Sequence, residues 1–294
     1  MTTTAPVNGI DIGYETHGDP DGEPLLLVMG LGAQLTAWPA ELCDALADRG
    51  FHVVRYDNRD TGLSTKFADV GGDFMTSFLK ASQGEPVELA YTLADMAADG
   101  MALLDHLGID SAHIVGASMG GMIAQTMAIE HPARVRTLTS IMSTTGEPEY
   151  GTPQPDAIAV LLRPAAVTRD EAIEADVTAR RVIGSPEHFD EAVARERAAE
   201  SYDRCYNPAG TARQLLAIVA GGSRAEGLAH LAVPALVIHG DIDPLVTFSG
   251  GQRTAELVPG AELLALEGMG HDLPPAYLGP IVEAITSLAA RTHA

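Results

Sequence analysis

The sequence predicts an α/β fold in which a mostly parallel central sheet is flanked by helices on both faces. The first observation is a series of short, strongly apolar runs along the 294-residue chain, which are typical of strands buried on both faces. The second is that segments with helical spacing separate these runs, as in parallel sheets. The third is one long segment without a convincing strand, residues 145–229, which predicts a helical insertion.

The elements of the first third of the chain follow this alternation. The apolar run 24–29 predicts a strand, and the apolar spacing over 38–46 predicts a helix. The run 52–56 predicts the second strand. Apolar residues over 91–107 fall on roughly one stripe, which predicts a helix that ends at Gly108.

The later elements continue the same order. Short apolar runs predict strands, and segments with helical spacing predict the helices between them. The predicted elements are a strand over 113–115, a helix over 121–129, strands over 138–142, 235–238 and 261–266, and a closing helix over 281–290.

The segment 145–229 interrupts the alternation. Residues 168–199 are rich in Ala, Glu and Arg and are predicted to be helical. Roughly eighty-five residues far exceed the usual connection of about four to six, so we expect a helical cap rather than a loop. The core domain would then comprise 1–144 and 230–294. The alternative is that these are ordinary crossover helices.

Composition limits the possible partners. The chain has 18 basic and 40 acidic side chains, a formal net charge of −22. It should therefore repel polyanions, which argues against nucleic acid or an anionic membrane surface as a partner. The oligomeric state, monomer or homodimer, is left open.

Cysteine usage and the start of the chain favour a cytoplasmic location. Cys43 and Cys205 do not form a disulfide framework, and we expect free thiols. The first residues lack the basic end and apolar core of a signal peptide. No apolar stretch of about eighteen residues suggests an integral membrane segment.

The pentad Gly116-Ala117-Ser118-Met119-Gly120 fits the pattern G-x-S-x-G. A predicted strand leads into it and a predicted helix leads out, which is the setting of a nucleophile elbow. In such an elbow the serine has strained backbone angles, and glycines avoid collisions with the neighbouring strands. A simple turn is the alternative, because Gly and Ser are common in turns.

A nucleophilic serine needs a base and an acid that orients the base. His271 follows the last predicted strand directly and should lie at the sheet edge where catalytic groups gather. His239, at the end of the preceding strand, is its rival. Asp241 and Asp243 both follow that preceding strand, and either fits the role of the acid. We expect Asp243, which lies in the second half of the loop just before a proline that can open the next helix. The chain order is then serine, aspartate, histidine, the order known for G-x-S-x-G hydrolases.

These motifs resemble those of the α/β-hydrolase superfamily of serine esterases. "GASMGG", "HGDIDP" and "GMGHDLP" match the nucleophile, acid and histidine loops of the family. "LLLVMGLGAQLTAW" and "VVRYDNRDTGLS" resemble mycobacterial lipase-like carboxylesterases and aclacinomycin methylesterase. The resemblance implies that the second aspartate, Asp243, is catalytic. It also implies that the backbone N–H groups of Leu31 and Met119 form the oxyanion hole.

Two positions depart from the family pattern. Met29 precedes Gly30 where members commonly have histidine, and Asp60 stands in a turn that often has glycine there. The missing histidine is not the catalytic base, and backbone oxyanion donors do not depend on side-chain identity. We interpret the turn that contains Asp57, Arg59 and Asp60 as structural.

The predicted function is hydrolysis of a small-molecule carboxylic ester through an acyl-enzyme. No cofactor is implied, and no Cys/His zinc spacing or phosphate-binding loop occurs. A thioesterase or other acyl hydrolase uses the same triad, perhydrolysis is a conceivable side activity, and a low-turnover binding protein or receptor can share the fold. Four cap residues are predicted to bind substrate, with cap packing as the alternative: Phe189, Tyr202, Tyr206 and Leu215.

Overall fold

The computed structural model describes residues 2–68 and 73–293. Within these residues one eight-stranded sheet has the order β1-β2-β4-β3-β5-β6-β7-β8. Strand β2 pairs in an antiparallel manner with both β1 and β4. All other neighbours in the sheet, from β4 through β3 to β8, pair in parallel. The strands are β1 (Thr3–Val7), β2 (Ile10–His17), β3 (Glu23–Val28), β4 (Phe51–Tyr56), β5 (Ala112–Ala117), β6 (Val135–Ile141), β7 (Ala235–Gly240) and β8 (Glu262–Leu266).

Each of the six predicted strands is present, and the predicted fold class is confirmed. The hairpin of β1 and β2 was not predicted. Asn8 and Gly9 join these two strands with φ angles of 49° and 77°. Asn-Gly is a strong hairpin signal because both central residues of the turn need positive φ.

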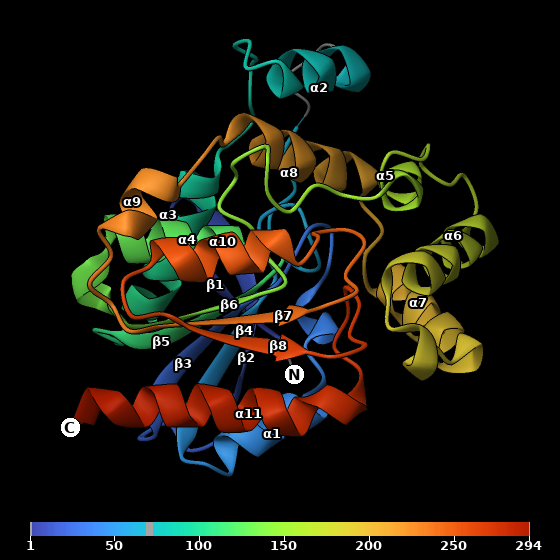
Figure 1. The fold of residues 1–294 in the computed structure, drawn as a ribbon. Helices are drawn as coiled ribbons and strands as arrows, with labels where there is room; N and C mark the ends of the chain where they lie inside the picture. The colour runs from blue at the N-terminus through green and yellow to red at the C-terminus, as the bar shows by residue number, and fades with distance from the viewer. Residues whose placement is uncertain (1, 69–72, 294) are drawn as a thin grey trace.

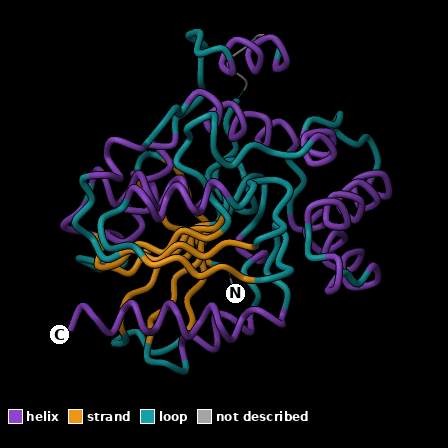
Figure 2. The backbone as a smooth tube through the Cα atoms, viewed as in Figure 1, coloured by secondary structure: helices purple, strands orange, loops and turns teal. Residues whose placement is uncertain are grey.

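Helices cover the sheet on both faces, as Figure 2 shows. Leu25 and Leu27 of β3 pack in a cluster with α1 and α11, whereas Leu26 and Val28 pack with α3 and α4. This alternation explains why residues 25–28 of the strand are all apolar. The helices are α1 (Ala40–Ala47), α2 (Phe74–Ser82), α3 (Leu93–His106), α4 (Met119–Glu130), α5 (Pro155–Leu161), α6 (Arg169–Ile183), α7 (Glu191–Arg204), α8 (Pro208–Ala220), α9 (Ala225–Ala229), α10 (Ser249–Leu257) and α11 (Pro275–Ala290).

The described residues also contain short 3₁₀ helices and two free thiols. The 3₁₀ helices are η1 (Leu35–Ala37), η2 (Pro132–Arg134), η3 (Pro186–His188) and η4 (Arg291–His293). Cys43 and Cys205 are unpaired, as predicted. Among the described residues, no helix has both the length and the apolar character needed to cross a membrane.

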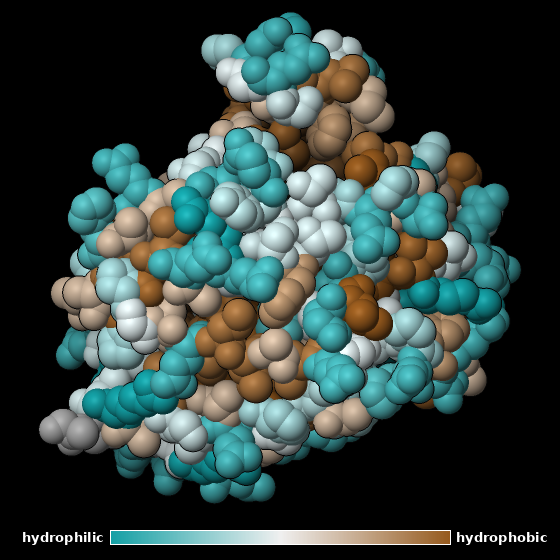
Figure 3. Space-filling model, in the orientation of Figure 1, coloured by the Kyte–Doolittle hydropathy of each residue, from teal (hydrophilic) through white to brown (hydrophobic). Residues whose placement is uncertain are grey.

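Five helices, α5 to α9, separate β6 from β7, and residues 142–234, all described, contain no strand. In Figure 1 the arrowheads of β7 and β8 point toward the side on which α6 and α7 lie. Helix α9 instead packs near α4 and α10. The helix α2 projects above α8 (Figure 1), and the space-filling view shows it as a knob above apolar surface (Figure 3).

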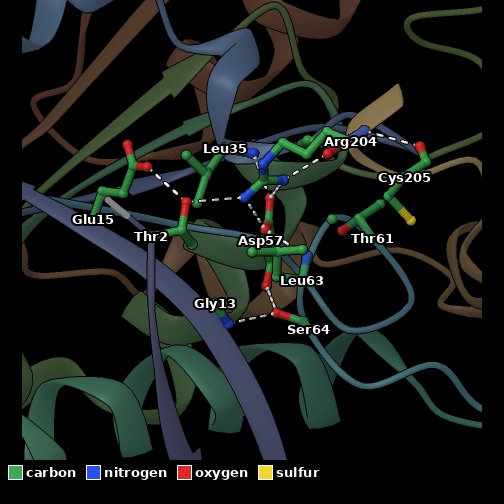
Figure 4. Close-up of polar contacts among 12 residues, drawn as sticks. Thr2, Gly13, Glu15, Leu35, Asp57, Thr61, Leu63, Ser64, Arg204 and Cys205 are labelled. Atoms are coloured by element: carbon green, nitrogen blue, oxygen red, sulfur yellow. Dashed lines mark hydrogen bonds and ion pairs between the residues drawn. The ribbon is translucent and has the colours of Figure 1, made fainter. Parts of the chain in front are cut away.

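Two ion pairs with fully buried carboxylates attach α7 and α8 to the turn after β4. Arg204 at the end of α7 donates to both carboxylate oxygens of Asp57, at 3.1 and 2.7 Å. Figure 4 shows that Asp57 also accepts from the backbone of Leu35 and Leu63. Arg213 of α8 pairs in the same way with Asp60, which is fully buried.

Asp60 therefore has a structural reason for replacing the usual glycine. Its φ of 71° is the left-handed conformation that glycine adopts readily and aspartate tolerates. Its carboxylate accepts hydrogen bonds from Arg213, from the Tyr91 hydroxyl at 2.6 Å and from the Phe67 backbone at 2.8 Å. The turn thus binds the helices inserted between β6 and β7 to the core.

Candidate active site

The structure places Ser118 on a sharp turn between β5 and α4, with φ 56° and ψ −122°. A Cβ on Gly116 would lie 2.1 Å from the carbonyl oxygen of Gly120. A Cβ on Gly120 would lie 2.0 Å from the carbonyl oxygen of Val28. Only glycine fits at either position, so the pentad encodes the close approach of strand, turn and helix.

Backbone contacts hold the turn in place. The Ser118 N–H donates to the carbonyl of Ile141 on β6 at 2.9 Å, and the Ser143 hydroxyl donates to the Ser118 carbonyl at 2.8 Å. Both partners come from the neighbouring strand and its loop. The strained backbone of Ser118 is therefore held at both its N–H and its carbonyl. A strained backbone conformation persists only where the surrounding structure holds it in this way.

A chain of hydrogen bonds joins the three polar side chains that the sequence singled out. The His271 Nε2 lies 2.9 Å from the Ser118 Oγ, and its Nδ1 lies 2.7 Å from the Asp243 Oδ2. Asp243 is 2% exposed. Elements separated by 153 and 28 residues in the chain thus meet at one point.

The surroundings of Asp243 keep its carboxylate charged. Burial raises its pKa, but the His271 charge and hydrogen bonds from His239 and His271 outweigh burial and lower the pKa to about 2. The other oxygen, Oδ1, accepts from the backbone N–H groups of Leu245 and Val246 at 2.8 and 2.9 Å. Asp243 is therefore an ionised acceptor at neutral pH.

The two rival residues lie elsewhere. Asp241 is exposed and accepts from the Gly268 N–H at 2.7 Å, so it holds the start of the histidine loop. His239 is fully buried, with its Nε2 2.7 Å from the Val246 carbonyl oxygen and 3.5 Å from the Asp243 Oδ2. Because both neighbours are acceptors, Nε2 carries the proton. His239 supports the acid loop and does not reach Ser118.

The loop after β3 runs beside Ser118. A Cβ on Gly30 would lie 3.0 Å from the Ser118 Cβ. The next residue, Leu31, lines the same cavity as Ser118. On the other side, Met119 is the first residue of α4, so its N–H has no intrahelical acceptor. Both N–H groups come from the segments that flank Ser118.

A cavity of about 1180 Å³ opens over Ser118 and His271. Helices between β6 and β7 form much of its wall, and the wall is mostly apolar. The four predicted substrate-binding residues all line it: Phe189, Tyr202, Tyr206 and Leu215. Phe74 and Met75 of α2 line it too, although the sequence analysis did not predict a helix there. The Phe/Met/Leu clustering over 74–79 is the signal that could have found them.

Comparison with known proteins agrees with this architecture. The family model described as "alpha/beta hydrolase fold" matches residues 23–274. The chain therefore belongs to the α/β-hydrolase family, and the predicted resemblance is confirmed. With methylesterases among its full-length relatives, it is an enzyme of the carboxylic-ester hydrolase class.

Two kinds of relative cover nearly the whole chain. Rhodomycin D methylesterase from Streptomyces sp. strain C5 is 31% identical over 293 residues, 92% of each chain, and that from Streptomyces peucetius is also 31% identical. A putative carbamate hydrolase from Caulobacter segnis is 28% identical, again over 92% of each chain.

Solved structures share the fold. The enol-lactonase from Burkholderia xenovorans LB400 superimposes with a TM-score of 0.75 at 23% identity, covering 98% of this chain and 100% of that one. A meta-cleavage product hydrolase from Pseudomonas fluorescens IP01 gives 0.78 at 20% identity, covering 98% and 97%. At these identities the likeness concerns the fold alone.

Proposed function

We propose that this protein hydrolyses a carboxylic ester through an acyl-enzyme, with Ser118 as the nucleophile, His271 as the general base and Asp243 as the acid. The observation that carries the proposal is the unbroken chain of contacts, 2.9 Å from Ser118 to His271 and 2.7 Å from His271 to Asp243. Both distances lie within the reach that proton transfer requires.

The first half of the reaction forms the acyl-enzyme. The Ser118 oxygen attacks the ester carbonyl carbon while His271 takes the hydroxyl proton through Nε2. Asp243 accepts the Nδ1–H, which leaves Nε2 free as the base and stabilises the imidazolium. When the tetrahedral intermediate collapses, the C–O bond to the alcohol breaks and His271 gives its proton to the leaving oxygen.

Water completes the second half. His271 removes a proton from water as the water oxygen attacks the acyl carbon. The bond from the acyl carbon to the Ser118 oxygen then breaks, His271 returns the proton to that oxygen, and the carboxylic acid leaves. In both halves we assign the Leu31 and Met119 N–H groups to the oxyanion. The position of Met119 at the start of α4 adds the favourable end of the helix dipole.

We assign residues 145–229 as a cap that selects the substrate. Helices α5 to α8 and the loops between them contribute much of the cavity wall, including Phe189, Tyr202, Tyr206 and Leu215. The cavity, about 1180 Å³, exceeds the range of about 300 to 1000 Å³ that is usual for small-ligand sites. We therefore infer a bulky, largely apolar substrate, and the methylesterase relatives favour the methyl ester of such an acid.

A substrate panel tests this function. It comprises p-nitrophenyl esters of rising acyl length, methyl esters of small and of polycyclic aromatic acids, and acyl-CoA thioesters, each with the parent and Ser118→Ala. We expect the polycyclic methyl ester to have a higher kcat/KM than the small one, and Ser118→Ala to lose turnover. Faster turnover of thioesters would make the protein a thioesterase. Binding without turnover by the parent would make it a binding protein.

A further inference from the structure

The second half of the histidine loop is bonded to the helices inserted between β6 and β7. The His271 N–H donates to the carbonyl of Ile183, the last residue of α6, at 2.7 Å. The Gly270 N–H donates to the Ser185 hydroxyl at 2.9 Å. Ser185 in turn donates to the Asp272 Oδ1 from its N–H at 3.1 Å and from its hydroxyl at 2.6 Å.

Ser185 is the centre of this contact. Its side chain is fully buried, and its hydroxyl both accepts from Gly270 and donates to Asp272. Gly270 and Asp272 flank His271 on its two sides. A single hydroxyl therefore holds the backbone of the residue before His271 and the side chain of the residue after it.

The backbones of the two segments also touch. A Cβ on Gly270 would lie 2.4 Å from the carbonyl carbon of Gly184, and one on Gly184 would lie 2.8 Å from the Asp272 Oδ2. The contact has no room for a side chain at either glycine. Such close packing transmits a displacement of α6 directly to the histidine loop.

Backbone bonds to the core hold the first half of the loop, Gly268 and Met269. Asp241 accepts from the Gly268 N–H, and Met269 accepts from the Ile242 N–H at 3.4 Å. The next three residues are bonded to the inserted segment. The His271 N–H donates to Ile183, and the Gly270 N–H and the Asp272 carboxylate both bond to Ser185. The position of the His271 backbone thus depends on a segment about 85 residues away in the chain.

We propose that Ser185 is a positioning residue for the general base, so that the cap sets the geometry of His271 as well as the shape of the cavity. This inference rests on the proposed function. The imidazole has to meet Ser118 and Asp243 at hydrogen-bond distance at the same time. A misplacement of about 1 Å in such a geometry costs on the order of a hundredfold in rate.

Ser185→Ala tests the proposal, because alanine leaves the backbone in place and removes the two hydroxyl hydrogen bonds. We expect kcat to fall about tenfold to a hundredfold, with KM within about threefold of the parent. The rate of Ser118 inactivation by a phosphonate should fall in parallel. A loss confined to KM, or an unchanged kcat, would overturn the proposal.

Ser64→Ala is the matched control. The Ser64 hydroxyl is buried as well, accepts from the Gly13 N–H at 2.9 Å and donates to the Asp57 carbonyl at 2.6 Å, as Figure 4 shows for Gly13. It makes the same number of hydrogen bonds away from the histidine loop. We expect Ser64→Ala to lower the melting temperature and keep the parental kcat. Equal kcat losses in both variants would show a general effect of destabilisation and contradict the proposal.

Asp272 supplies a second test should Ser185→Ala not fold. Asp272→Ala removes the acceptor, whereas Asp272→Asn retains an oxygen for both Ser185 donors. We expect the asparagine variant to recover most of the kcat that the alanine variant loses. Equal losses in the two variants would overturn the proposal that Ser185 positions His271. Ser118→Ala distinguishes a failure of the Ser185 proposal from a failure of the proposed function. If Ser118→Ala abolishes turnover while the Ser185 and Asp272 variants keep the parental kcat, the proposed role of Ser185 is wrong and the proposed function stands.

Discussion

Replacing Asp243 with asparagine changes one carboxylate oxygen into an amide NH₂, and the structure determines which one. The Oδ1 accepts from two backbone N–H groups, those of Leu245 and Val246, so the oxygen of the amide stays there. The NH₂ then faces the Nδ1 of His271, in place of the oxygen that lies 2.7 Å away. Nδ1 has to accept this hydrogen bond, so the proton moves to Nε2.

An imidazole with its proton on Nε2 cannot take the proton of Ser118. We therefore expect kcat to fall by about three to four orders of magnitude, the loss found for the wrong tautomer in a serine triad. This corresponds to about 4 to 5.5 kcal/mol of transition-state stabilisation. The assay is steady-state hydrolysis of a p-nitrophenyl ester by the purified Asp243→Asn variant.

Asp241→Asn is the matched control, two residues away. Asp241 is exposed, and asparagine keeps an oxygen that can accept from the Gly268 N–H. We expect its kcat to stay within about threefold of the parent, since surface changes of this kind have small effects. A large loss in Asp241→Asn together with a small one in Asp243→Asn would refute the assignment of the acid.

Three further predictions concern the cap, the buried ion pair and acid stability. Leu215→Trp should fill part of the cavity and lower kcat/KM for long acyl chains about tenfold relative to short ones. If the dependence of kcat/KM on chain length does not change, residues 30–38 and 272–277 determine the specificity instead. Asp60→Asn removes the buried negative charge that pairs with Arg213 and should cost about 3 to 5 kcal/mol in urea unfolding, whereas a loss below about 1 kcal/mol would contradict the role of the pair. The lowered pKa of Asp243, about 2, adds stability above its unfolded pKa of about 4, and this is lost as pH falls from about 4 through 2. Asp243→Asn should lack this part of the acid dependence in unfolding curves, and an identical dependence would argue against it.

Local signals in the sequence were sufficient for the parallel part of the fold. The buried run of β3 is apolar on both faces, as the alternation of Leu25 and Leu26 between the two core clusters shows. The strands β1 and β2 lack such an apolar run, because part of each strand is exposed, and Asn8-Gly9 is the better signal for them. The closing helix begins at Pro275, six residues before the predicted start, because proline is well suited to the first turn.

Some residues of the site could likewise be predicted from local motifs, whereas others could not. Ser118, Asp243 and His271 each follow a strand and carry local motifs, so their meeting could be expected from topology. Ser185 and the partners of Asp60 have no such motif. The Ser185–Gly270 and Asp60–Arg213 contacts join residues 85 and 153 positions apart, and only the packed structure brings them together.

Covalent labelling of Ser118 tests the central claim most directly. The protein is incubated with a serine-directed fluorophosphonate, and intact mass with peptide mapping locates the adduct. We predict one adduct per chain, on Ser118, absent in Ser118→Ala and formed much more slowly when His271 is replaced by alanine, because the base that activates the hydroxyl is lost. An adduct on another residue, or full ester turnover by Ser118→Ala, would contradict the account.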